Sequence, residues 1–505
     1  MRLRISARKS DLARLQAYMV GEALQEKNPG LEVIYKFKES LGDINLTDPL
    51  WKIPEKGVFT EDFYRELIDG DTDMVVHSWK DLPTEGKPDT EIVATLPRAD
   101  QRDLLLVKKT SLPRIQASKK LNLFSSSPRR EYNLKGFLAD HLPYQGLDVS
   151  FQSVRGNIPT RIRKLLETNE IDGLIVAKAA LDRLLVAPQA EFTEVKALLR
   201  GYLAQVNWMV LPLSINPNAA AQGALAIEIA SSRPDLKPVL AAIHDEDTFI
   251  AAQNERKILS SYGGGCHQKI GIAVLRKPYG EITFLRGLTD GGVVLKQNSL
   301  QKVEAVSTFP SEKMHTPETI SDRKMLSFTG IPSGTGALLV ARGEAWPDSL
   351  SFDGYVWAAG LKTWKNLAAK GIWVHGSSES LGEQEDPRIN VLADKNLHWV
   401  KLTHEGGYGK DMPILATYTL VDGDFEKNFQ DNFQDKEAFF WMSGTQFLKM
   451  AKAHPEILSK HHASGPGNTH QIIREFLVNN LKEKYSDEKV QVFLSQEDWR
   501  SQCTK

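Results

Sequence analysis

The feature that most constrains the fold of this chain is a repeated order of elements: a short apolar run, a polar turn and a helical pattern. Residues 2–6 alternate like a strand, and the apolar residues from Leu12 to Leu24 recur at helical spacing. The same order begins again at three later runs, Met74–Val76, Leu121–Phe124 and Leu174–Ala177, the last followed by a helix-like Lys178–Leu185. Repeated strand–helix alternation predicts α/β domains with largely parallel sheets.

A basic turn follows the predicted strand ends, and most of these turns also carry hydroxyl groups. The turns are Ala7-Arg8-Lys9-Ser10, His77-Ser78-Trp79-Lys80-Asp81, Ser125-Ser126-Ser127-Pro128-Arg129-Arg130, and Arg155-Gly156-Asn157 with Thr160 and Arg161. Ligands of α/β sheets collect at the carboxyl ends of strands, where helix N-termini present free N–H groups. Arginine binds a carboxylate through two parallel hydrogen bonds. The turns therefore favour a polycarboxylate ligand, with phosphate as the alternative although no Walker-type glycine loop is present.

The size and charge of the chain limit its class. A length of 505 residues predicts about three to five domains. The formal net charge of -1 gives no global field toward nucleic acid or an anionic membrane, so an anion site needs a local concentration of arginines. No apolar run approaches the ~18 residues of a membrane span. The N-terminus alternates charged and apolar residues where a signal peptide would be continuously apolar, so we expect a cytoplasmic protein.

The two cysteines, Cys266 and Cys503, are too far apart in the sequence for a disulfide framework, and no CxxC or HExxH spacing indicates a metal. A lone cysteine is most often a small buried hydrophobe. Three glycines, residues 263–265, precede Cys266 and leave its sulfur little shielded, which allows it to reach a bulky group. We expect Cys503, close to the C-terminus, to be exposed and without function.

Seven segments, in register, resemble the porphobilinogen deaminase family over roughly residues 1–335. They are Ala7-Arg8-Lys9-Ser10, Lys52 through Lys56-Gly57-Val58-Phe59, His77 to Asp81, Ser125 to Arg130, Arg155-Gly156-Asn157, Gln222-Gly223-Ala224, and Gly263 to Cys266. The resemblance implies two α/β domains built like a periplasmic binding protein, residues 1–104 with 218–243 and residues 105–217, with the active site between them. It also implies a small α+β domain, residues 244–335, that carries the cofactor cysteine on a loop.

The resemblance implies a hydroxymethylbilane synthase, a transferase that joins four porphobilinogen molecules head to tail with release of ammonia. Its cofactor is a dipyrromethane, held by a thioether at the position of Cys266. A fixed carboxylate at Asp81 stabilises the cation left when ammonia departs and accepts hydrogen bonds from pyrrole N–H groups. Each substrate brings an acetate and a propionate, so several cations are required. We expect no nucleic-acid or membrane partner, and a monomer.

The implied site residues fall into three groups. The catalytic group is Asp81, Lys80 and Arg8. The cofactor-binding group is Cys266, Ser78, Lys80, Asp81, Ser125, Ser126, Ser127, Arg129, Arg130, Arg155 and Gly156. The substrate-binding group is Arg8, Ser10, Lys52, Lys56, Phe59, Arg161 and Gln222, of which Lys52 and Lys56 belong to a stretch that the family uses as a mobile loop.

The chain departs from the family pattern at three positions: Leu41 replaces an arginine, and Phe124 and Ala221 replace glycines. Each change is expected to narrow or reshape the cleft. Residues 186–210 are longer than usual, which we interpret as an insertion at the edge of the second domain. The cysteine, the aspartate and the main arginine set remain, so we expect activity.

The last third, residues 340–505, resembles a shortened uroporphyrinogen-III synthase, an α/β protein. Residues 356–363 and 462–469 each turn at glycine into a helix, and we expect strands at 372–374, 414–420 and 439–445 between them. The residues that would line a cleft are Thr363, Ser443, Gly444, Thr445, Gly465, Asn468 and Thr469, although loop capping explains most of them equally well.

Two alternatives stay open. One is a bifunctional enzyme that also cyclises hydroxymethylbilane to uroporphyrinogen III. The C-terminal region is accordingly either a working cyclase or a degenerate structural remnant. The other is a non-catalytic dicarboxylate-binding protein, because the first two domains would share that fold and fold does not fix function.

Overall fold

The computed structural model describes residues 1–39, 61–264, 268–303, 305–320, 322–409, 412–421, 425–482, 485–486 and 489–504. The chain forms two compact units. The first comprises Met1–Asp140, Tyr144–Arg276 and Thr283–Gln297, and the second comprises His141–Pro143, Lys277–Ile282 and Asn298–Lys505. Among the described residues, no helix has the length and apolar character that a membrane crossing requires.

The first sheet of the first unit has the order β2-β1-β3-β10-β4. Its strands are β1 (Arg2–Arg8), β2 (Glu32–Lys38), β3 (Met74–Ser78), β4 (Thr90–Ala94) and β10 (Leu225–Ala230). Strand β1 runs parallel to β2 and β3, whereas β10 runs antiparallel to β3 and β4. Met74 and Val76 enter the core that includes α1 (Asp11–Lys27), while Val75 packs with Phe63 of α3 (Glu61–Ile68) on the other face. The period-two pattern of β3 thus covers both faces of the sheet.

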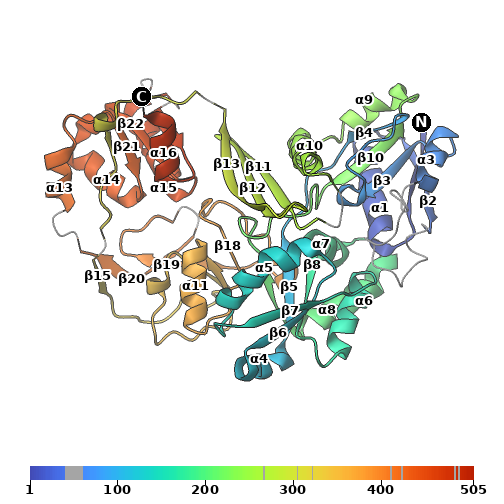
Figure 1. Cartoon of the computed structure of the whole chain (residues 1–505), viewed down its shortest axis with the longest axis horizontal. Helices are drawn as coiled ribbons and strands as arrows, with labels where there is room; N and C mark the ends of the chain where they lie inside the picture. The colour runs from blue at the N-terminus through green and yellow to red at the C-terminus, as the bar shows by residue number, and fades with distance from the viewer. Residues whose placement is uncertain are drawn as a thin grey trace. The chain divides into compact units, whose positions relative to one another are not determined.

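The second sheet has the order β7-β6-β8-β5-β9 and repeats the plan of the first. Its strands are β5 (Asp103–Lys108), β6 (Lys120–Phe124), β7 (Asp148–Gln152), β8 (Gly173–Ala177) and β9 (Val206–Val210). Strand β6 is parallel to β7 and β8, and β5 is antiparallel to β8 and β9. Its helices are α4 (Leu112–Ser118), α5 (Pro128–His141), α6 (Ile158–Glu167), α7 (Lys178–Val186) and α8 (Thr193–Leu203), drawn around the sheet in Figure 1.

The chain passes between these two sheets twice, once after β4 and once after β9. The first crossover comprises residues 95–102 and the second comprises residues 211–224. Residues 186–210, the expected insertion, form α8 and the edge strand β9, so this stretch completes the second sheet.

The third part of the fold is α10 (Glu246–Ser261) beside a three-stranded sheet (Figure 1). Its strands are β11 (Gly271–Lys277), β12 (Gly280–Leu288) and β13 (Val294–Lys302). The fully buried carboxylate of Glu255 on α10 accepts hydrogen bonds from Arg98 and Asn218 and from the backbone N–H groups of Ala221 and Val274. Arg98 and Ala221 lie on the two crossovers, so this one carboxylate ties α10 and β11 to both.

The second unit contains two α/β sheets. The larger sheet has the order β15-β20-β19-β16-β17-β18, and its strands pair in parallel except for the antiparallel pair of β15 and β20. The smaller sheet has the order β14-β21-β22-β23, and all its strands pair in parallel. The strands of the larger sheet are β15 (Arg323–Met325), β16 (Ala337–Val340), β17 (Tyr355–Ala358), β18 (Gly376–Ser377), β19 (Trp399–His404) and β20 (Ile414–Leu420). Those of the smaller sheet are β14 (Met314–His315), β21 (Ala438–Trp441), β22 (His461–Ser464) and β23 (Val490–Val492).

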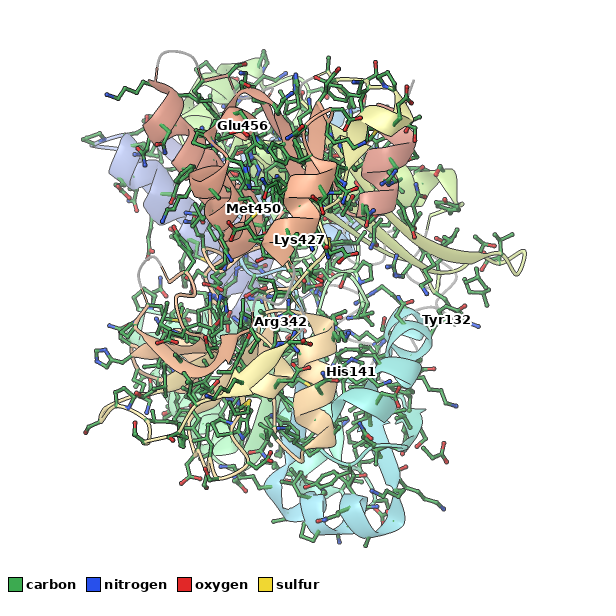
Figure 2. All side chains as sticks on the ribbon, turned by 90° about the vertical axis from the view of Figure 1, so that its left-hand side faces the viewer. Tyr132, His141, Arg342, Lys427, Met450 and Glu456 are labelled. Atoms are coloured by element: carbon green, nitrogen blue, oxygen red, sulfur yellow. The ribbon has the colours of Figure 1, made fainter. Side chains whose placement is uncertain are left out.

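The helices of this unit follow several of these strands. They are α11 (Leu361–Ala369), α12 (Asn390–Ala393), α13 (Phe425–Asn432), α14 (Gly444–Ala453), α15 (Asn468–Leu481) and α16 (Gln496–Cys503). Figure 2 shows Arg342 just past β16 and Met450 on α14. The side chain of Met450 is fully buried in an aromatic core. The predicted strand at 414–420 is confirmed. The strand expected at 372–374 is wrong, because pairing with β17 begins at Gly376.

Strand pairing also shows where the C-terminal sheets begin. Met314 of β14 pairs with β21, and β15 pairs with β20, so the second unit's sheets take up chain that lies well before residue 340. The three-stranded sheet of the third part ends at Lys302, before the expected boundary at residue 335.

The expectation that Cys503 is exposed is wrong. Its side chain is 1 % exposed and packs with Phe309 and Trp499, because Trp499 and Cys503 share the buried face of α16. Burial raises the pKa of the Cys503 thiol to about 11, which keeps the sulfur protonated and unreactive at neutral pH.

Candidate functional site

The basic turns predicted from the sequence lie at strand ends, as expected. Arg8 ends β1 and Ser78 ends β3, and these strands are parallel neighbours, so both residues reach the same edge of the first sheet. Ser125 follows β6 and Lys178 follows β8 in the second sheet. The two parallel sets therefore each present a polar edge.

The turn that carries Lys80 and Asp81 is a single 3-10 turn, Trp79–Asp81. Trp79 is buried in an alanine-rich cluster, which anchors the turn. Ser78 exchanges hydrogen bonds with the buried amide of Gln16 (3.0 and 3.1 Å). Arg256 of α10 donates to the Trp79 and Leu82 carbonyl oxygens. With its neighbours fixed in this way, Asp81 is left exposed.

Lys80 lies between the first sheet's carboxylate and the second sheet's arginines. Its Nζ donates to Oε1 of Gln222 at 3.3 Å. Burial, and then the charges of Arg130 and Arg129, lower the pKa of Lys80, while the charges of Asp81 and Asp103 act to raise it. The ammonium is thus in electrostatic reach of both halves of the site.

Arg129 and Arg130 open α5 and both bind Asp103, a residue that the sequence did not single out. Nη2 of Arg129 donates to Asp103 Oδ2 at 2.8 Å. Arg130 donates to both carboxylate oxygens, from Nε to Oδ2 at 2.9 Å and from Nη2 to Oδ1 at 2.6 Å. Burial opposes ionisation of Asp103, but the two guanidinium groups hold the pKa of its carboxyl well below its usual range. The signal for this residue is an acidic group at the head of the apolar strand β5.

The serine turn is held by local hydrogen bonds. Ser125 is 1 % exposed, and its Oγ accepts from the Ser127 N–H at 3.3 Å. Ser126 Oγ donates to the Val154 carbonyl and accepts from the Val154 N–H. Phe124, which replaces a glycine of the family pattern, is 5 % exposed, so its ring lies inside the second domain.

Arg161 connects the α6 end of the site to Asp81. Its Nε donates to the Gly156 carbonyl at 2.7 Å. Burial and the neighbouring Arg130 and Arg155 lower the pKa of Arg161 to about 10, and the charge of Asp81 acts in the opposite direction. Gly156 has φ +119, and a Cβ there would come within 2.8 Å of the Thr160 side chain, so this turn requires glycine.

The glycine loop approaches the turn of Asp81. Gly263 and Gly264 have φ +97 and +63, and a Cβ on Gly264 would lie 2.5 Å from Oγ1 of Thr84. Thr84 is three residues after Asp81. Five predicted positions lie outside the described residues: Cys266, Lys52, Lys56, Phe59 and Leu41.

The remaining predicted positions have local roles. Ser10 is the N-cap residue of α1 and makes no side-chain capping bond, and Arg8 is partly buried. Gln222 is 1 % exposed and lies on the second crossover. Ala221, where the family pattern has glycine, has φ +63 and is fully buried. No group of three or more metal-ligating side chains occurs in the described ranges.

Comparison with known proteins agrees with this geometry. Residues 3–238 match the family model "Porphobilinogen deaminase, dipyromethane cofactor binding domain". A porphobilinogen deaminase of Syntrophomonas wolfei is 36% identical over 287 residues, which are 57% of this chain and 84% of that protein. One of Clostridium novyi is 32% identical over 307 residues, 60% of this chain and 94% of that protein.

A solved domain of Bordetella pertussis BvgS is 10% identical, with a TM-score of 0.25, and the match covers 52% of this chain and 92% of that domain. The two porphobilinogen deaminases are matched over most of their length at 36% and 32% identity. The chain belongs to the porphobilinogen deaminase family.

Proposed function

We propose that Asp81 is the catalytic carboxylate of this chain and that cations from both five-stranded sheets hold its substrate. The function is that of a hydroxymethylbilane synthase in tetrapyrrole biosynthesis, which joins four porphobilinogen molecules with release of ammonia. The cofactor of this family is dipyrromethane. One observation carries the assignment of roles. Lys80 and Arg161 each interact electrostatically with Asp81 of the first sheet, and each also interacts with other arginines of the second sheet.

The residues present fit a dipyrromethane. Each of its rings carries an acetate and a propionate, which require cations. Lys80 and Arg161 each interact electrostatically with Asp81, and Arg155 is a charged neighbour of Arg161. Gly264 lies against Thr84, so the glycine loop that leads to Cys266 approaches the turn of Asp81. When bound through Cys266, the group supplies the pyrrole carbon to which the first substrate is joined.

Each residue of the site has a definite task in this proposal. The exposed carboxylate of Asp81 accepts hydrogen bonds from pyrrole N–H groups and stabilises positive charge on the substrate's methylene carbon as ammonia leaves. Lys80 and Arg161 bind substrate carboxylates on either side of it. Ser78 and Gln222 orient the Asp81 turn and Lys80 through their hydrogen bonds. Arg8 and Ser10 extend the cationic edge along β1.

The domain division follows the sheets except at Asp103 and Leu104, which begin β5 of the second sheet but fall within residues 1–104. We assign residues 1–104 with 218–243 and residues 105–217 to two domains of periplasmic-binding-protein type, since each has the same strand order with one antiparallel strand supplied across a crossover. The cofactor-carrying domain, expected at residues 244–335, is limited in this proposal to residues 244–302, because β14 and β15 pair in the sheets of the second unit. The cytoplasmic location and the monomeric state remain predictions.

The resemblance of residues 340–505 to uroporphyrinogen-III synthase remains a prediction. No observation favours cyclisation of hydroxymethylbilane as a second activity. Its predicted cleft residues are engaged locally: Thr363 donates to the Ala341 carbonyl, Ser443 caps α14, and Asn468 accepts from the Glu383 N–H. If porphobilinogen yields only uroporphyrinogen I, formed by spontaneous closure, the unit is no cyclase. Accumulation of isomer III would establish the second activity. The dicarboxylate-binding alternative is likewise without support.

The cofactor assignment is tested by Cys266→Ala beside the matched control Cys503→Ala. Intact-mass measurement should show the added mass of two pyrrole units on the parent protein and on Cys503→Ala, and none on Cys266→Ala. Consumption of porphobilinogen should disappear only in Cys266→Ala. A parent protein without the added mass, or a Cys266→Ala variant with full turnover, would contradict the proposal.

A further inference from the structure

Asp103 is a buried carboxylate near the site that accepts several hydrogen bonds. It is the first residue of β5 and is 1 % exposed. Its two oxygens accept five hydrogen bonds from the side chains of Arg129, Arg130, Asn216 and Gln222. The donors come from the start of α5 and from the second crossover, and Asp103 itself directly follows the first crossover. The carboxylate therefore joins the second domain to both connections between the domains.

The arginine pair depends on this carboxylate. The donors of Arg129 and Arg130 that do not reach Asp103 bind the Asn216 side chain and the carbonyls of Pro217 and Ile175. Two buried guanidinium groups repel each other, and a buried charge is tolerated only when it is paired. With Asp103 between them, the pair keeps one net positive charge in a fixed position at the N-terminus of α5.

Asp103 also orients Lys80 through one amide. Nε2 of Gln222 donates to Asp103 Oδ1 at 2.9 Å and to the Gln101 carbonyl at 2.8 Å. Because both acceptors lie on the Nε2 side, the amide oxygen faces the other way and accepts from Lys80 at 3.3 Å. Lys80 is the neighbour of Asp81 in the same turn. A continuous path of hydrogen bonds thus runs from Asp103 to the proposed catalytic turn.

We propose that Asp103 is a positioning residue of the deaminase reaction, which fixes Arg129 and Arg130 directly and Lys80 through Gln222, so that Lys80 keeps its place beside Asp81 and the arginine pair keeps its place near Lys80. It touches no substrate in this assignment. The inference rests on the proposed function and goes beyond it, because it places the control of the cationic geometry in a group buried beneath the site.

The electrostatic consequence has a definite sign. Four charged groups act on Lys80: Asp81 in its own turn, Arg129 and Arg130 on α5, and Asp103 on β5. The two carboxylates raise its pKa and the two arginines lower it. Removing the charge of Asp103 leaves the arginines unopposed on that side, so Lys80 loses its proton at a lower pH.

The test compares Asp103→Asn and Asp103→Glu in the full chain with its cofactor. We expect Asp103→Asn to lower kcat by about 10- to 100-fold, since small misplacements of positioning groups have effects of that size. The alkaline limb of its kcat/KM profile should move to lower pH. Asp103→Glu keeps the charge but shifts the carboxylate, so it should lower kcat while leaving the alkaline limb where it is in the parent.

Asp172→Asn is the matched control. Asp172 is also fully buried, pairs with Arg114 and accepts from the Asn122 N–H at 2.9 Å, but it precedes β8 and so lies at the opposite end of that strand from Lys178. It should lower the thermal midpoint without moving the pH profile. A merely structural Asp103 would behave in the same way.

Each outcome decides the question. The proposal is overturned if both Asp103 variants keep the parent's kcat and pH profile, or if Asp172→Asn shifts the profile as Asp103→Asn does. It is also overturned if neither Asp103 variant folds while Asp172→Asn does. If only Asp103→Glu folds, its kcat and alkaline limb decide. A parent protein that does not consume porphobilinogen contradicts the proposed function instead, and is thereby distinguished from failure of this inference.

Discussion

The two five-stranded sheets share one strand order but contribute opposite chemistry to the site. The first sheet presents Lys80 and the exposed Asp81 on a single 3-10 turn after β3. The second presents arginines at the starts of two helices, α5 and α6, and burial lowers the pKa of two of them, Arg129 and Arg161. In the proposed function, the first domain supplies the catalytic carboxylate together with one substrate-binding cation, Lys80, and the second domain supplies arginines.

The difference shows that the same topology accepts different residues at equivalent strand ends, and that the buried partners determine which groups remain available. Arg129 and Arg130 are 4 % and 7 % exposed, and they donate hydrogen bonds to Asp103 and to backbone carbonyl groups. Arg161, bound to the structure mainly through Nε, is the second-sheet arginine that interacts with Asp81. Cationic turns at strand ends are thus unequal in what they can offer a ligand.

Among the cations of the second sheet, the largest effect should come from Arg161→Gln. It removes the second sheet's cation beside Asp81, and a hydrogen bond to a charged group contributes about 1.5–3 kcal/mol, so kcat/KM should fall by roughly 10- to 100-fold. The loss should appear mainly as a higher KM for porphobilinogen, because a carboxylate contact is present before the reaction begins. Steady-state kinetics on the purified holoenzyme measure both parameters.

The control is Arg163→Gln on the same helix, whose side chain is 59 % exposed and 3.9 Å from Glu167. It should leave kcat/KM within about twofold, since exposed ion pairs contribute little. Equal losses in the two variants would mean that net charge, and not the position of Arg161, matters.

A smaller effect is expected at Ala221, which lies on the crossover between the sheets. Its φ of +63 costs an alanine about 1–2 kcal/mol, which glycine avoids. Replacing Ala221 by glycine removes a buried methyl group and raises the entropy of the unfolded state. Together these two effects cost about 1–2 kcal/mol, which offsets the strain that glycine relieves. Ala221→Gly should therefore leave the urea midpoint nearly unchanged.

Ala224→Gly provides the comparison, because Ala224 is 2 % exposed in the same cluster and does not have positive φ. It should lose about 1–2 kcal/mol of stability, since no strain is relieved. Equal destabilisation of the two variants would show that Ala221 is not strained.

The sequence predicted the local part of this fold well. The runs at residues 2–6, Leu121–Phe124 and Leu174–Ala177 are confirmed as β1, β6 and β8, and Lys178–Leu185 is confirmed as α7. These predictions succeed because side-chain periodicity depends on neighbours in sequence. The turns after the strands followed from the same pattern.

The parts that could not be predicted depend on contacts between distant residues. The proposed role of Asp103 requires Gln222, which is 119 positions away. The burial of Cys503 requires Phe309, and no pattern in the sequence places these two residues together. The early start of the C-terminal sheets depends on the pairing of Met314 with Ala438. Short strands such as β14 carry too few residues for a periodic pattern.

The central claim is that the carboxylate of Asp81 acts on the substrate, whereas the cations only hold it. The most direct measurement is the intact mass of Asp81→Asn holoenzyme after incubation with porphobilinogen, with Asp89→Asn, an exposed aspartate bound by Tyr64, as the control. We predict that Asp81→Asn keeps its cofactor mass and adds pyrrole units at least about 100-fold more slowly than the parent, while Asp89→Asn adds them normally. Extension of Asp81→Asn at the parent's rate would contradict the account.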